Sequence, residues 1–373
     1  MNVWRTPGMP ALLASAALGF TGFALLLPVA PMWAVHIGAD NLGAGLVNSV
    51  LMGCTVLAQL LVGRLLKRVG APVTLAIGLV LLGAPALAHM AAGSLWAVLL
   101  LAALRGFGFG ILTVTGVDGI AGLVPQEYRG RAVGAYGLAL AAPQFVLTPA
   151  GPWLAEHVGF ELVFVLAAAP LLAVPLALAF TRSVPTPPRT TEDRISVSRG
   201  LVGSIAALVV ITASGGAILT FAPQFGSAEV AFGALLGLTG AAALTRWLVG
   251  GVADRFGPAK FIDPMLYVGA IGLVTVAFGI GAHGLLVVAG AVLVGVAYGS
   301  LQNVTLVQAF AASGEHARRA VSVAWNVGFD AGTGLGALAV GALATSNSFP
   351  SAFAAMAIGC VVVGACWTVG RRL

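Results

Sequence analysis

The stretch GGVADRFGPAK at residues 250–260 places three charged residues within seven positions of an otherwise almost uncharged sequence. A second stretch, GRLLKRVGAP at residues 63–72, has the same outline, with Lys67 at the position equivalent to Asp254. Long apolar runs flank both stretches, which indicates short polar turns between membrane-spanning segments. Repetition of the outline predicts an internally repeated architecture.

The composition excludes a soluble globular protein. Hydrophobic residues make up 59% of the chain, charged residues only 8%, and the mean hydropathy is +1.03. Soluble proteins carry roughly 25% charged residues. The apolar runs are too long, and alternate too little, for an outer-membrane β-barrel. The three cysteines lie within apolar runs, so we expect packing roles and no disulfide. The sequence therefore predicts an all-α membrane protein.

We expect twelve transmembrane helices. The first apolar segment is too long for a cleavable signal peptide and lacks a small-residue cleavage site, so we interpret it as the first helix. The expected helices lie near residues 10–35, 42–62, 73–91, 94–123, 132–155, 161–181, 200–222, 231–249, 263–281, 284–311, 320–344 and 351–370.

The basic residues predict the orientation. Of the 18 Lys and Arg residues, all but Arg105 and Arg246 fall in the terminal segments or in alternate loops, all on one side of the membrane. Positive residues concentrate on the cytoplasmic side, so we expect a multi-pass inner-membrane protein with both termini cytoplasmic. The net charge of +6 then reflects topology and attraction to anionic lipids, and we expect no nucleic-acid binding.

Two matches define the repeat. A shift of 187 residues aligns Gly63 with Gly250, and a shift of 188 aligns EYRGRAV at 127–133 with EHARRAV at 315–321. Both shifts are about half of the chain length, which predicts two six-helix halves of the same orientation. We therefore expect an N-terminal half, a cytoplasmic linker rich in Pro, Thr and charge, and a C-terminal half, at residues 1–181, 182–199 and 200–373.

The two charged stretches resemble the signature loop of the major facilitator superfamily, G-x-x-x-D-R-x-G. The pattern is complete in the second copy and degenerate in the first, and its residues here are Gly250, Asp254, Arg255, Gly257 and Gly63, Lys67, Arg68, Gly70. The resemblance covers the whole chain and implies the major facilitator fold. It also implies a monomeric transporter whose two halves rock about a central small-molecule site.

Two further stretches narrow the resemblance. LRGFGFGILTVTG at 104–116 is similar to the arginine-bearing motif of proton-coupled members, and AYGLALAAPQFVLTPAGPWL at 135–154 resembles the antiporter motif of the fifth helix. The second motif departs from the family, because Ala142 replaces the glycine before Pro143 and no glycine pair follows. The whole looks most like bacterial drug:proton antiporters and related exporters of metallophores or metabolites.

In this superfamily the inner loops latch the halves together. The resemblance implies that Asp254 lies near Arg131 at the start of the fifth helix, where the helix dipole also favours a carboxylate. In the other copy, Lys67 has the wrong sign for Arg318 at the start of the eleventh helix, while Asp118 is positioned to hold Lys67 or Arg68. We expect an asymmetric latch. The alternative is that these charges only set the orientation of the helices in the membrane and end the helices.

Ionisable residues inside the spans are the proton-coupling candidates, because each costs about 2.5–3.5 kcal/mol to insert at a helix centre. Arg105 lies near mid-membrane and matches the arginine of the family motif, and Asp330 lies about as deep in the eleventh helix. Both residues have structural pairing as an alternative role. Asp118 is closer to the inner surface, so we expect gating or pairing there, and we expect a structural role for Arg246.

Uncharged polar residues in the spans are the substrate-cavity candidates. Tyr298 and Gln302 are four residues apart and share a helix face. Such side chains also hydrogen-bond neighbouring helices, which is the alternative at every position. The full set is Tyr298, Gln302, Asn303, Thr212, Tyr136, Gln144 and Asn326. The first helix is nearly apolar, which favours an amphiphilic substrate over a sugar or a highly charged ion.

Motifs of other chemistries are absent from the sequence. There is no P-loop, H-E-x-x-H motif or close Cys/His cluster, so we expect no cofactor, no metal site and no catalytic residues. The sequence thus predicts a secondary transporter and not an enzyme, most simply a proton-coupled exporter of a drug, metallophore or metabolite. The alternatives are a proton symporter or facilitator for uptake and, in another class, a transporter-like membrane sensor.

Overall fold

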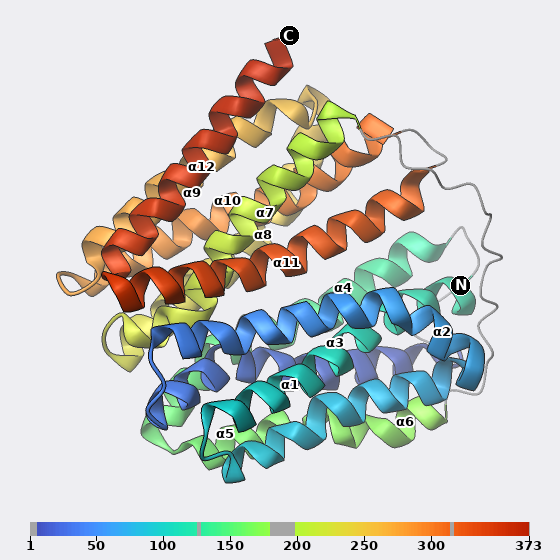
Figure 1. Ribbon diagram of the computed structural model, residues 1–373. Coiled ribbons are helices and arrows are strands. Elements are labelled where there is room, and N and C mark those ends of the chain that lie inside the picture. The colour runs from blue at the N-terminus through green and yellow to red at the C-terminus, as the bar shows by residue number, and fades with distance from the viewer. Residues whose placement is uncertain (1–5, 125–127, 180–197, 314–316, 373) are drawn as a thin grey trace. The chain divides into compact units, whose positions relative to one another are not determined.

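The computed structural model describes residues 6–124, 128–179, 198–313 and 317–372. All regular elements in these ranges are helices (Figure 1). The α-helices are α1 (Met9–His36), α2 (Asn41–Ala88), α3 (Leu95–Leu123), α4 (Arg129–His157), α5 (Phe160–Ala167), α6 (Val174–Leu178), α7 (Arg199–Phe221), α8 (Ala228–Phe256), α9 (Ala259–Gly279), α10 (Gly284–Ser313), α11 (Arg318–Ser346) and α12 (Phe349–Arg372). Short 3₁₀ helices cover His89–Ala91, Ala169–Ala173 and Ala222–Gln224.

The helices have the length and composition of membrane spans. Among the described residues, 11 helical segments are long and apolar enough to cross a membrane, and every expected span overlaps one of them. Helices suit this setting because hydrocarbon offers no partners for backbone N–H and C=O groups, which a helix satisfies internally. The prediction of an all-α membrane protein is confirmed.

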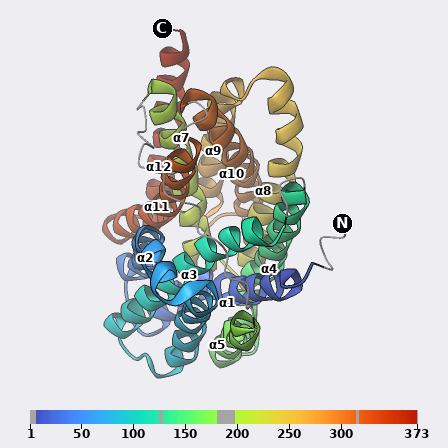
Figure 2. The same ribbon diagram turned by 90° about the vertical axis from the view of Figure 1, so that its right-hand side faces the viewer.

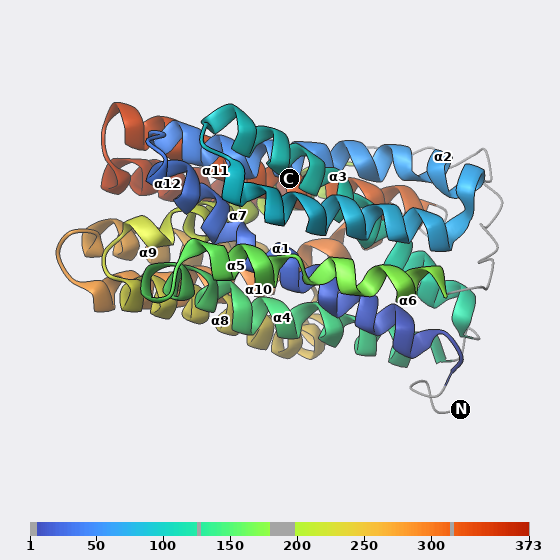
Figure 3. The same ribbon diagram turned by 90° about the horizontal axis from the view of Figure 1, so that it is seen from below.

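The α2 segment contains two of the expected spans. The candidate span Asn41–Ala91 is 51 residues long, which at about 1.5 Å per residue is more than twice the roughly 30 Å of a hydrocarbon core. Gly70 interrupts it with φ 78° and ψ 168°, and the chain reverses direction within α2 (Figures 1 and 3). The loop expected at 63–72 is therefore wrong in extent, because one glycine in a left-handed conformation makes the whole turn.

Its repeat at 250–260 is equally short. α8 continues to Phe256, Gly257 follows with φ 88°, and α9 begins at Ala259. Glycine is favoured directly after a helix and proline at the start of the next one, which is the order of Gly257 and Pro258 here. The two repeated stretches thus share a glycine of positive φ that ends the preceding helix.

The sixth expected span, at 161–181, is broken into pieces. α5 ends at Ala167, a 3₁₀ turn follows, and α6 covers only Val174–Leu178. Pro170 and Pro175 lie at the starts of the second and third pieces. Proline lacks the N–H that an α-helix needs at interior positions, so each of these residues weakens the regular helix where the pieces join.

The chain forms two compact units. The first unit consists of residues 1–38 and 50–188, and the second of residues 39–49 and 189–373. Most of the linker expected at 182–199 lies outside the described residues. The expected boundaries of the two halves stay predictions.

The start of α2 packs with the second unit, which the sequence did not indicate. The backbone N–H of Leu42 donates to Oγ1 of Thr345 over 2.9 Å, and Nδ2 of Asn48 donates to Oγ1 of Thr220 over 2.9 Å. Gly341 allows close approach, since a Cβ there would lie 2.6 Å from the carbonyl oxygen of Asn41. α11 and the first turns of α2 therefore pack backbone to backbone.

The core of the first unit is aromatic. Phe23 of α1 stacks on Phe109 of α3 with ring centroids 3.8 Å apart, and Phe20 meets Phe109 edge-on at 5.3 Å. At another level of α1, Trp33 contacts Phe160 and Phe164 of α5. Aromatic pairs of this kind add about 0.5–1.5 kcal/mol beyond the area that they bury.

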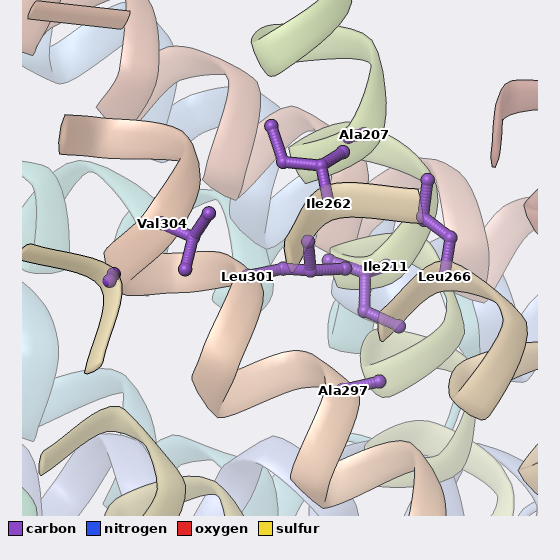
Figure 4. Packing of buried hydrophobic residues seen from close by; sticks show 8 residues of the cluster. Ala207, Ile211, Ile262, Leu266, Ala297, Leu301 and Val304 are labelled. Carbon is purple, nitrogen blue, oxygen red and sulfur yellow. The ribbon is translucent and has the colours of Figure 1, made fainter. Parts of the chain in front are cut away.

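The core of the second unit lies among α7, α9 and α10, which contact one another (Figure 2). Ile211, Ile262, Leu266 and Leu301 are fully buried there, and their side chains converge between the three helices (Figure 4). In lipid, helices associate through van der Waals packing rather than through removal of apolar surface from water. The close fit of these side chains is therefore what holds this unit together.

Candidate functional site

A polar cluster on α8 and α10 forms the centre of the candidate site in the second unit. Nη1 of Arg246 donates a hydrogen bond to Oε1 of Gln302 over 3.0 Å. Nδ2 of Asn303 donates to the backbone carbonyl of Arg246 over 3.1 Å. Gln302 is only 7% exposed, whereas Arg246 is exposed. The two amides that the sequence singled out thus hold an arginine that it did not place in the site.

α11 brings the carboxyl candidate to the same cluster. Tyr298 interacts electrostatically with both Asp330 and Arg246, and its hydroxyl interacts with the side chain of Thr333. Asp330 is 6% exposed and Thr333 is 3% exposed. Three helices therefore supply a cation, a carboxyl group and a phenol to one small region of the second unit.

Aromatic rings border this cluster. Tyr298 meets Phe329 edge-on with centroids 5.9 Å apart, and Phe329 stacks with Trp325 at 5.6 Å. Nε1 of Trp325 donates to Oγ1 of Thr305 over 3.1 Å, which fixes the indole. Tyr298 fits against α7 because Gly215 has no side chain, and a Cβ there would lie 2.5 Å from the tyrosine ring. The site therefore combines charged groups with a rigid aromatic wall.

Three of the other cavity candidates bond mainly to their own helices. Oγ1 of Thr212 donates to the carbonyl of Leu208 over 2.8 Å, and Nδ2 of Asn326 donates to that of Ser322 over 2.8 Å. Nε2 of Gln144 donates to the carbonyl of residue 140 over 3.3 Å. Thr212 is fully buried, while Asn326 is exposed. Of these three residues, Asn326 and the half-buried Gln144 lie at a surface of their unit.

Arg105 and Tyr136 belong to the first unit and are buried. Arg105 on α3 is 0% exposed, and its Nη2 donates to the carbonyl of Gly22 on α1 over 3.3 Å. Its Nε and Nη1 have no hydrogen-bond partner among the described residues, and neither has the hydroxyl of Tyr136. Tyr136 packs against Gly116. The first unit thus holds a guanidinium group with incomplete hydrogen bonding in its interior.

The gating-loop residues are described in part. Lys67 and Arg68 are exposed at the end of the first half of α2, and the guanidinium of Arg255 lies 5.7 Å from the ring centroid of Phe256. Gly63 and Gly250 lie within helices. The side chains of Asp118 and Asp254 lie outside the described residues. The latch therefore stays a prediction.

Sequence reasoning missed two features of the structure, one in the candidate site and one in the first unit. We expected a structural role for Arg246 and did not foresee that it bonds the cavity candidate Gln302. The available signal was that Arg246 is one of only two basic residues inside the expected spans. The second feature is the aromatic core of the first unit, because the sequence gives no sign that Phe20 and Phe23 of α1 meet Phe109 of α3. Among the described residues, no group of three or more His, Cys, Asp or Glu could hold a metal ion.

Comparison with known proteins gives one family match and several relatives. The family model of the Major Facilitator Superfamily matches residues 12–322. An uncharacterized transporter of this superfamily from Mycobacterium tuberculosis is 27% identical over 266 residues, covering 69% of this chain and 36% of that protein. Another from Pseudomonas aeruginosa is 32% identical over 171 residues, covering 44% of this chain and 41% of that protein. The chain thus matches less than half of the length of each of these relatives.

Solved structures match over nearly the whole chain. A bacterial homolog to the human lysosomal transporter Spinster gives a TM-score of 0.82 at 15% identity, covering 100% of this chain and 98% of that one. The peptide transporter POT in complex with sulfate gives 0.80 at 15% identity, covering 99% and 95%. A mutant of the nucleoside transporter NupG gives 0.75 at 15% identity, covering 97% and 99%. At these identities the likeness establishes the fold.

Proposed function

Because the chain belongs to the major facilitator superfamily, we propose that it is a secondary transporter that exports a small amphiphilic organic compound in exchange for protons. The family is one of transporters and not of enzymes. The compound would be a drug, metallophore or metabolite. The chain would work as a monomer in the inner membrane, with both termini cytoplasmic, by alternating access of its two halves.

The observation that carries the proposal is the polar cluster of the second unit. Arg246, Gln302, Tyr298 and Asp330 all lie in membrane-spanning helices, yet they come together from α8, α10 and α11. Ionisable residues inside membrane proteins are costly and tend to mark substrate or proton pathways. A cluster that joins hydrogen-bonding groups to aromatic rings suits an amphiphilic compound.

In the proposed mechanism Asp330 carries the proton. A proton arriving from outside neutralises the carboxylate of Asp330, a role that carboxyl groups inside membrane spans have in proton relays. The neutral form loses its attraction for groups that donate hydrogen bonds, which releases substrate outward. On the inner side the proton leaves, and the restored carboxylate takes part in binding the next substrate molecule. Arg105 is the second coupling candidate, in the first unit.

Proton release on substrate binding tests the mechanism. Substrate added to the purified protein in weakly buffered detergent should release protons that a pH dye detects. The Asp330→Asn variant should bind substrate without this release. Asp263→Asn is the matched control, because Asp263 is also a buried carboxyl in a membrane helix, 8% exposed, and its partners Thr368 and Arg371 are not part of the cluster. Equal proton release by wild type and Asp330→Asn would contradict the proposal.

Uptake by proton symport is the second candidate function. Ala142 replaces the glycine of the antiporter motif, and α4 continues as a helix through Pro143. Counterflow in inside-out and right-side-out vesicles distinguishes the two directions. Export predicts proton-driven accumulation only in inside-out vesicles, and uptake predicts it only in right-side-out vesicles. A membrane sensor predicts specific binding with movement in neither preparation.

A further inference from the structure

Arg246 presents a positive charge on the surface of the second unit, within a membrane span. The candidate span is Ala228–Gly251, so Arg246 lies one turn or more from its end. An arginine costs about 2.5–3.5 kcal/mol near a helix centre and less toward an end, and arginines within spans usually face a water-filled cavity or another protein group. The neighbouring Trp247 is 77% exposed, so this part of α8 also carries an accessible aromatic ring.

One edge of the guanidinium is fixed, and the other edge has no partner among the side chains that the structure describes. Gln302 accepts a hydrogen bond from Nη1, and Asn303 ties the backbone of Arg246 to α10. A guanidinium group carries five N–H donors in a planar fork. Among the described residues, Nη2 and Nε of Arg246 make no hydrogen bond, and no described acidic side chain forms a salt bridge with this arginine. An oriented cation with free donors is what a planar anion requires.

The groups around the cation favour an amphiphile. Tyr298 on α10 interacts electrostatically with Arg246, and its ring continues into the Phe329 and Trp325 stack on α11. The same tyrosine interacts with Asp330, so a carboxyl group also faces this region from α11. A ligand would therefore place its anionic end at Arg246 and an apolar or aromatic body against the rings.

We infer that the cluster is an anion-binding subsite, in which Arg246 binds the carboxylate or phosphate group of an amphiphilic substrate. Arg246 makes paired hydrogen bonds through Nη2 and Nε, and Gln302 is a positioning residue that holds the guanidinium in place. Charge-assisted paired bonds of this kind are about twice as strong as neutral ones. The inference rests on the proposed transport function and narrows its substrates to amphiphiles that carry an anionic group for Arg246 and, apart from it, a hydrogen-bond donor for the carboxylate of Asp330.

Matched acid and amide probes test the charge preference. Aryl-alkanoic carboxylates of increasing chain length are each compared with their primary amides, by calorimetric titration of the purified protein in neutral detergent. Wild type should bind the preferred acid at least tenfold more tightly than its amide. Arg246→Gln should weaken acid binding at least tenfold, to the level of the amide, and leave amide binding unchanged. Arg246→Lys should lose less, since it keeps the charge but not the fork.

Arg371→Gln is the control for loss of a positive charge. Arg371 lies on α12, bonds Asp263 and Ala259, and is outside the cluster, so this variant should keep the full acid preference. Thermal unfolding of each variant verifies that the fold is retained. Equal binding of acids and amides by wild type, no binding of any acid, or an acid preference that survives Arg246→Gln would each overturn the inference.

A lipid headgroup is the other source of an amphiphilic anion, so titrations are repeated in nanodiscs. Acid binding in pure phosphatidylcholine supports the inference. Stabilisation by phosphatidylglycerol that depends on Arg246, without binding of any acid, would assign the subsite to lipid and overturn the substrate inference. The transport proposal and the anion subsite can be contradicted by different results. Selective acid binding without transport in proteoliposomes contradicts the transport proposal alone, and transport unaffected by Arg246→Gln contradicts the anion subsite alone.

Discussion

Gly272 of α9 and Gly290 of α10 lie against each other so closely that neither position has room for a side chain. A Cβ on Gly290 would lie 2.6 Å from the carbonyl oxygen of Gly272, and a Cβ on Gly272 would lie 2.8 Å from the carbonyl oxygen of Gly290. Small residues at helix contacts let backbones approach in membranes, where packing drives association. This pair therefore sets the distance between α9 and α10 at this point.

Gly290→Ala should destabilise the second unit by about 1–3 kcal/mol, because the added methyl group meets backbone that cannot move aside. Gly251→Ala on α8 is the matched control, since a Cβ there meets nothing within 4 Å. Thermal unfolding in detergent should show a lower midpoint for Gly290→Ala and an unchanged or higher one for Gly251→Ala. Equal midpoints for both variants would contradict the close packing.

Gln302→Glu should reduce binding of anionic substrates at least tenfold with little change in stability. The new carboxylate still accepts the hydrogen bond of Arg246, now 3.0 Å from Gln302, but it neutralises the charge that attracts the anion. Gln308→Glu, the same change further along α10, should leave anion affinity intact. Calorimetric titration measures both, and an unchanged affinity for Gln302→Glu would show that the charge of Arg246 is not used.

Arg105→Met should retain or increase stability and abolish proton-coupled transport. Arg105 is fully buried, with Nε and Nη1 lacking partners among the described residues. Replacing a buried charged group by an apolar side chain of similar size is often neutral or stabilising. Thermal unfolding and proton-driven flux in proteoliposomes measure the two effects. A large loss of stability would mean that Arg105 has the structural role that is its alternative.

Asp263→Ala should destabilise the protein more than Arg371→Ala. Asp263 is 8% exposed and accepts hydrogen bonds from Thr368 Oγ1 at 2.9 Å and from Arg371 Nη2 at 3.5 Å. The side chain of Arg371 is 38% exposed, so its ion pair contributes at most about 1 kcal/mol. Asp263→Ala removes the buried carboxylate, so the hydroxyl of Thr368 loses its hydrogen bond to α9. Chemical unfolding of both variants verifies the order.

Asp254→Asn should shift the protein toward its inward-open state if the expected latch forms. Removing the carboxylate loses its attraction to the start of α4, worth about 0.3–1 kcal/mol or somewhat more when partly buried. Lys67→Asp should have the opposite effect. It gives the stretch at 63–72 the negative charge that Asp254 has at the equivalent position of the stretch at 250–260. Labelling of single cysteines placed on each side of the membrane reports the balance, and no change for Asp254→Asn would exclude the latch.

Local signals in the sequence predicted the helical spans well. A run of about 20 apolar residues specifies a membrane helix without help from its neighbours, because lipid forces the backbone to bond internally. The family resemblance likewise rested on short local motifs, and the family match over residues 12–322 confirmed it. Local rules also located Gly70 and Gly257, although the turns that they make proved shorter than expected.

Only the tertiary structure decided which polar groups meet. Arg246 and Gln302 are far apart in the sequence, and their hydrogen bond depends on how α8 packs on α10. The same is true of Phe23 and Phe109, and of the first turns of α2, which pack with the second unit. The hydrophobic pattern of a membrane helix specifies that it crosses lipid but hardly distinguishes its faces, since lipid tails and neighbouring helices are equally apolar. The fold thus followed from the sequence alone, whereas the composition of the candidate site followed from helix packing.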